Sequence, residues 1–124
     1  MTKFGVGVIA AAVLLLASGG ATGEGQQKAG RFPQFENADV RVWKSVVTPN
    51  SPLSMHRHDH PRVVVALVGG DMKSVEQSGQ SETHHWETGK AYWLPAMPPG
   101  AMHADVNAGS KTMEVMVVEL KNAK

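Results

Sequence analysis

The sequence of 124 residues contains no cysteine. This absence excludes disulfide bonds, lipidation of a cysteine after a signal peptide, and thiolates that act as nucleophiles or metal ligands. The folded chain must therefore be stabilised by its hydrophobic core, and the chemistry of any site must come from other side chains.

Neither sign of charge is in excess, with 12 Lys and Arg against 11 Asp and Glu. The charged residues also form no run of one sign. This balance argues against a protein that holds nucleic acid or an anionic membrane through bulk electrostatics. The partner that we expect is a small molecule bound in a pocket, with no nucleic acid involved.

The N-terminal region has the three parts of a secretory signal peptide. Lys3 supplies the positive start, residues 6–17 are apolar, and small residues follow over 18–23. Ala21 and Gly23 suit the −3 and −1 positions of a cleavage site after Gly23. A membrane anchor is disfavoured because a spanning helix needs about 20 apolar residues. We therefore expect an exported protein, periplasmic or extracellular, with residues 1–23 removed and no stable membrane anchor afterwards.

The rest of the chain is expected to form a short spacer over 24–36 and one β-domain over 37–124. Short runs of alternating apolar and polar residues are separated there by turn-forming residues, and no window has a helical period. Strands are expected over 40–48, 53–58, 62–68, 71–77, 81–87, 91–94, 101–106 and 112–120. Eight short strands at this spacing predict an all-β antiparallel barrel or jelly roll.

Two of these runs, 63–68 and 113–120, are apolar almost throughout. Such runs are typical of strands that are buried on both faces. One face would line the barrel, and the other would pack against a second sheet or subunit. The pattern therefore favours a homodimer.

Histidine is the residue type that stands out in this chain, with six copies. His56, His58 and His60 alternate, so on a strand the first two point to one face and His60 follows if the strand continues. His103 lies on a separate predicted strand and is the candidate for a third imidazole. An isolated His-x-His pair is more often solvated or hydrogen-bonded than metal-bound, and His103 alone is typical of a core or rim histidine. The neighbouring residues change this balance.

The first histidine stretch resembles the first motif of the cupin superfamily, G-x5-H-x-H-x3–4-E-x6-G. His56 and His58 match its two histidines, and Gly69 stands where the motif ends in glycine. Asn50 occupies the place of the opening glycine.

The second stretch resembles the second cupin motif, G-x5-P-x-G-x2-H-x3-N, whose opening glycine is replaced by Tyr92. The remainder is intact as Pro98-x-Gly100-x2-His103-x3-Asn107. Together the two motifs span residues 50–107 in the correct order. The resemblance implies an antiparallel double-stranded β-helix, the jelly-roll barrel of cupins. It also implies one divalent transition metal (Fe, Mn, Ni, Zn or Cu) held by His56, His58 and His103.

The glutamate that completes the ligand set of cupins is missing, because its two permitted positions hold Arg62 and Val63. A guanidinium cannot ligate a cation. Three histidines could hold the metal with open positions, His60 could become a fourth ligand, or the metal could be lost with Arg62 binding an anion instead. The first two are favoured, because three unpaired histidines would be costly to bury.

Three further residues are candidates near this site. Arg62 is expected to bind a substrate carboxylate, and Tyr92 is expected to line the pocket. Asp105 shares a strand face with His103, where it would either orient a ligand histidine or cap a turn.

Cupins include dioxygenases, isomerases, lyases and binding proteins without activity, so the resemblance leaves the function open. One hypothesis is a metal-dependent enzyme acting on a small molecule, either as an oxygenase or as a Lewis-acid isomerase or lyase. The alternative is a non-catalytic protein that captures a metal or a small ligand.

Overall fold

Alternating apolar and polar side chains give this chain strands rather than helices, and they also decide which face of each strand is buried. The computed structural model describes residues 28–123. Its strands are β1 (Gly30–Glu36), β2 (Val40–Val47), β3 (Arg62–Val68), β4 (Gly70–Glu76), β5 (Ser81–Trp86), β6 (Ala91–Leu94), β7 (His103–Asn107) and β8 (Met113–Leu120). The expected signal peptide over 1–23 lies outside the described residues. Within them, no helix is long and apolar enough to cross a membrane.

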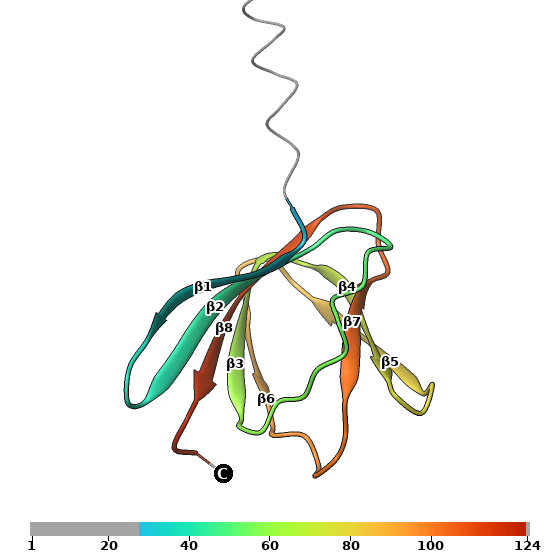
Figure 1. Cartoon of the computed structure of the whole chain (residues 1–124). Helices are drawn as coiled ribbons and strands as arrows, with labels where there is room; N and C mark the ends of the chain where they lie inside the picture. Colours follow the sequence, from blue (N-terminus) through green and yellow to red (C-terminus); the bar gives the residue numbers. More distant parts are fainter. Residues whose placement is uncertain (1–27, 124) are drawn as a thin grey trace, which may run out of the picture.

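The strands form two sheets that face each other (Figure 1). One has five strands in the order β1-β2-β8-β3-β6, and the other has three in the order β5-β4-β7. All pairings between neighbouring strands are antiparallel. The expectation of an all-β jelly roll is confirmed.

The core lies between the two sheets. Its buried members come from five strands: Trp43, Val47, Val64, Ala66, Met72, Trp86, Met113, Val115 and Val117. Strand β8 shows how the sequence produces this core, because its residues alternate between buried and half-buried along its whole length. The 113–120 run is therefore central, as its composition predicts.

Strand β1 lies in the segment that was expected to be a spacer, so the sheet begins before residue 37. It pairs with β2 from Gly30 to Glu36, with a bulge between Pro33 and Phe35. Six of its seven residues are exposed, and it forms the edge of its sheet. Proline is tolerated at an edge and at a bulge because its missing N–H is not needed there.

The strand expected over 53–58 is not a regular strand. Its backbone contacts β7 at only two places: Leu53 donates to the carbonyl of Asp105, and His56 forms an isolated bridge with His103. The long connection between β2 and β3, green in Figure 1, carries this segment along β7. The contact is short, but it positions the histidines.

The two residues that end the cupin-like motifs have structural roles. A Cβ on Gly69 would lie 2.0 Å from the carbonyl oxygen of Trp86, so only glycine fits where β3 turns into β4. The buried amide of Asn107 donates to the carbonyls of Val47 and Lys111, at 2.8 and 2.6 Å. These contacts tie the loop before β8 to the end of β2.

Candidate metal centre

Two stretches of chain that are far apart in sequence meet at His56 and His103. Each backbone N–H donates to the carbonyl of the other residue, at 2.8 Å in both directions. His58 is held by Met97, whose backbone N–H donates to the His58 carbonyl at 2.9 Å and whose sulfur accepts the His58 N–H at 3.3 Å. The backbone therefore fixes all three histidines.

The three imidazole rings pack together in edge-on (T-shaped) pairs. Ring centroids lie 4.8 Å apart for His56 and His58, 4.8 Å for His56 and His103, and 5.3 Å for His58 and His103. One nitrogen from each ring lies within 4.8 Å of the other two. This arrangement could hold one metal ion, as the resemblance to cupins implies.

The hydrogen bonds of His56 show which nitrogen is free. Its Nδ1 lies 2.6 Å from the carbonyl oxygen of Ser54, which only accepts, so Nδ1 carries the proton and Nε2 carries a lone pair. The Nε2 atoms of His56 and His103 are buried without a hydrogen-bond partner among the described residues. An unsatisfied buried acceptor costs about 1–3 kcal/mol. A metal ion would satisfy both atoms, so the residues present fit such an ion.

Burial keeps the three imidazoles neutral, which is the form that binds metal. Burial, assisted by the positive charge of Arg62, lowers the pKa of His58 to about 2. The pKa values of His56 and His103 are also lowered, again mainly by burial. No proton therefore has to leave the site before a cation enters at neutral pH.

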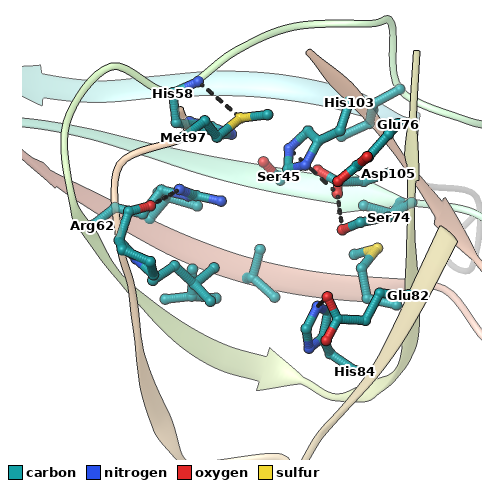
Figure 2. A pocket seen from close by; sticks show the side chains of 18 of the residues that line it. Ser45, His58, Arg62, Ser74, Glu76, Glu82, His84, Met97, His103 and Asp105 are labelled. Atoms are coloured by element: carbon teal, nitrogen blue, oxygen red, sulfur yellow. Dashed lines mark hydrogen bonds and ion pairs between the residues drawn. The ribbon is translucent and has the colours of Figure 1, made fainter. Parts of the chain in front are cut away.

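A cavity of about 670 Å³ lies beside the histidines, between the two sheets. Figure 2 shows side chains from both sheets pointing into it, with Arg62 on one side and His103, Asp105 and Ser74 on the other. His58 and His103 are part of its wall. A ligand in the cavity would therefore be in reach of an ion held by the triad.

Arg62 lies in the wall of the cavity, and its binding of a substrate carboxylate stays a prediction. Arg62 is only 7 % exposed, and its Nη1 donates to the carbonyl of Pro95 at 3.4 Å. Burial lowers its pKa to about 10, an effect that the carboxylates of Asp105 and Glu119 oppose. Arg62 therefore stays protonated at neutral pH.

Arg31 also lines the cavity, and the sequence pattern does not predict this, because residues 24–36 have the composition of a spacer. It pairs in register with Ser45 and lines the cavity beside it. Its guanidinium lies 5.2 Å from the ring centroid of Trp43, and Trp43 stacks on His58 with an angle of 2° between the rings. Only recognition of β1 as a strand could have placed this cation near the histidines.

Asp105 lies between two of the histidines. Its Oδ2 is 3.6 Å from Nε2 of His56, and its Oδ1 is 3.8 Å from Nε2 of His103. Oδ1 also accepts a hydrogen bond from the Ser74 hydroxyl at 3.2 Å. Asp105 therefore borders the histidine cluster, although it is not one of the three residues whose donor atoms all converge.

Two other expected site residues lie apart from this group. His60 is half-buried and is not part of the histidine cluster, so its role as a fourth ligand stays a prediction without support from the geometry. Tyr92 is not among the residues that line the cavity. Its hydroxyl accepts the Glu87 N–H at 2.9 Å, and its ring stacks on Trp86. This packing gives Tyr92 a structural role.

Comparison with solved structures identifies the fold. A cupin domain from Bordetella pertussis superposes with a TM-score of 0.63 at 26% identity, over 78% of this chain and 99% of that one. An RmlC-like cupin from Methanocaldococcus jannaschii gives 0.60 at 12% identity, over 78% and 84%. A cupin 2 conserved barrel protein from Salinispora arenicola gives 0.52 at 24%, over 77% and 76%. No family model and no curated protein sequence matches the chain. The resemblance seen in the motifs is thus confirmed by the fold.

The lowered pKa of His58 predicts that the metal-free protein loses stability as the pH falls below 6.5. In that range His58 binds a proton in the unfolded chain but not in the folded, buried state. The free energy of unfolding therefore decreases as the pH falls. One such histidine contributes about 1.4 kcal/mol per pH unit, or about 2 kcal/mol between pH 6.5 and 5. Urea unfolding of the metal-free protein at pH 7 and pH 5 measures this loss.

The matched comparison is between His58→Gln, which should reduce the pH dependence, and His85→Gln, which should not. His85 is exposed and contacts Asp71 on the surface. If the free energy of unfolding has the same pH dependence in the wild type and in His58→Gln, the pH dependence does not come from His58.

Proposed function

We propose that this cupin-fold chain is an exported protein that binds one divalent transition metal through His56, His58 and His103. The metal ion would act on a small anionic molecule bound in the adjoining cavity. A metal-dependent reaction of that molecule is the function that we favour. The observation that carries the proposal is the pair of buried, unpartnered Nε2 atoms of His56 and His103. Imidazole nitrogens suit Fe, Ni, Cu and Zn and also occur in sites that hold Mn.

Two guanidinium groups are candidates to bind an anionic ligand, in a cavity wall that Glu76, Glu82 and Asp105 also line. Arg62 and Arg31 both line it, and a guanidinium offers paired N–H donors that match a carboxylate. The buried Nε1 of Trp43 has no hydrogen-bond acceptor among the described residues, so it is a further donor for a ligand. The cavity volume of about 670 Å³ is within the range of small-molecule sites.

The residues of the chain would have separate roles in such a reaction. A bound metal would supply Lewis-acid polarisation of a substrate carbonyl or water, or redox chemistry with O₂ if it were iron. His56, His58 and His103 fix the position of the reacting group, and Arg62 holds the substrate carboxylate. The apolar side chains of Val64, Val115 and Val117 form an apolar part of the cavity wall.

A non-catalytic binding protein is the second candidate. It is favoured by Arg62, which stands where the resemblance to cupins places a ligand glutamate. A protein of this kind would use the same metal and the same guanidinium groups to retain a ligand without turnover.

The ligand assignment predicts that His103→Ala loses most of the bound metal and leaves the far-UV circular dichroism spectrum unchanged. The imidazole supplies one of three donor nitrogens, and its removal leaves too few to hold the ion. Elemental analysis of protein purified without a metal-binding tag measures the stoichiometry. His84→Ala is the control, because His84 lines the cavity but lies outside the histidine cluster. Full metal content in His103→Ala would show that the assignment is wrong.

The choice between catalysis and capture can be tested with a panel of thiols, phenols and keto-acids. We expect oxygen uptake by the iron-loaded protein with at least one acid, and Arg62→Gln should raise KM for that acid about tenfold or more while metal content stays the same. Neutral phenols should be unaffected by this substitution. Bound metal with acid binding but no turnover of any compound would favour the second candidate.

Export is the part of the proposal that rests on residues 1–23 alone. Secreted or periplasmic protein should have the mass of a chain that begins at Glu24. Recovery of the intact chain from the cytoplasm would contradict it.

A further inference from the structure

The Asp105 carboxylate lies against the histidine cluster, 3.6 Å from Nε2 of His56 and 3.8 Å from Nε2 of His103. We infer that Asp105 is a fourth metal ligand, and that it supplies from β7 the carboxylate that is missing at position 62. This inference rests on the proposed metal site and specifies its charge and its preferred ions.

The distances fit shared coordination better than hydrogen bonding. The Asp105 oxygens lie 3.6 and 3.8 Å from the free Nε2 atoms of His56 and His103, whereas an N–H···O hydrogen bond spans about 2.7–3.2 Å. Two donor atoms that each lie about 2.1 Å from one ion are about 3–4 Å apart. The two orphaned nitrogens and the carboxylate thus surround the same space.

The fold directs the carboxylate to this position. Strand alternation puts Asp105 on the same face of β7 as His103, two residues earlier. Ser74 pairs in register with Asp105 on β4 and donates its hydroxyl to Oδ1. This hydrogen bond orients the carboxylate and leaves Oδ2 directed toward His56. Ligand carboxylates in metal sites commonly have such a supporting donor.

A carboxylate near the ion would also balance part of the positive charge around it. Three neutral imidazoles bring no negative charge to a divalent cation, and Arg62 and Arg31 are close enough to lower the pKa values of the histidines. Asp105 acts in the opposite direction on His56 and His103. Its charge would offset the repulsion between the ion and the guanidinium groups.

A different reading makes Asp105 only a counterion of the two arginines, since its charge also raises their pKa values. The two readings differ in metal selectivity. Loss of a charge that is not a ligand weakens all divalent ions alike. Loss of an oxygen ligand weakens Mn²⁺ most, because carboxylate suits Mn²⁺ while imidazole suits Zn²⁺.

The test is titration of the metal-free protein, as the chain that begins at Glu24, with Mn²⁺, Co²⁺ and Zn²⁺. We expect Asp105→Asn to lower the affinity for Mn²⁺ about 100-fold or more and that for Zn²⁺ about tenfold, with a change in the visible spectrum of bound Co²⁺. Asp71→Asn is the matched control, because Asp71 lies on neighbouring β4 and pairs with exposed His85 on the surface. It should bind all three ions as the wild type does.

An equal loss of affinity for the three ions, with an unchanged Co²⁺ spectrum, would make Asp105 a counterion and overturn the inference. Unchanged binding in Asp105→Asn would also overturn it, and the histidine site would stand if His103→Ala still loses metal. A wild type that binds none of these ions would overturn both. Asp105→Ala with a native far-UV spectrum provides a second variant for the same comparison.

Discussion

The site depends on one short contact, the mutual backbone hydrogen bonds between His56 and His103. These two bonds join a loop to the first residue of β7, and they are the reason that the imidazoles from two distant stretches share one space. The five-stranded sheet would still form without them, because its pairings involve neither residue. The loop would no longer have a fixed register against β7, and the nitrogens would not converge. The convergence of the imidazoles therefore depends on two backbone hydrogen bonds outside the five-stranded sheet.

Burial has two effects at this site, and both favour a cation. It lowers the pKa values of the three histidines, with His58 brought to about 2, so the lone pairs are available at neutral pH. It also leaves the Nε2 atoms of His56 and His103 without hydrogen-bond partners among the described residues, so the metal-free state carries an energetic penalty. An ion would remove this penalty. The polar cluster is thus costly to fold alone and favourable when a metal binds.

The sequence predicts the fold and the triad because both depend on local patterns. Strand alternation shows in the residues themselves, and His56, His58 and His103 stand in motifs of fixed spacing. The position of Arg31 and the contact of Asp105 with His56 needed the tertiary structure, although the strand face that Asp105 shares with His103 is predicted from the sequence. Strand β1 lies at the edge of its sheet and contains Pro33. It does not have the apolar alternation that identifies a central strand. The expected strand over 53–58 bonds to β7 at two places only, and its residue pattern does not reveal this. The placement of Asp105 between two imidazoles follows from register with Ser74, which sequence alone does not give.

The wall of the cavity has a guanidinium on β3, Arg62, and a carboxylate on β7, Asp105. This distribution of charge explains how Arg62 and the histidines can lie in the same site. A glutamate at position 62 would place a negative charge on the wall where Arg62 now points into the cavity. With the carboxylate on β7 instead, an ion bound at the histidines would have an anionic neighbour in Asp105, and the β3 side is positive. Glu119, in register with Arg62 on β8, makes the burial of that guanidinium tolerable. If a metal ion is bound at the histidines, an anion in the cavity would meet a guanidinium on β3 and an electrophilic ion at the other side. These two positive groups would suit a ligand with its negative group at one end and its reacting group at the other, while Glu76, Glu82 and Asp105 line other parts of the wall.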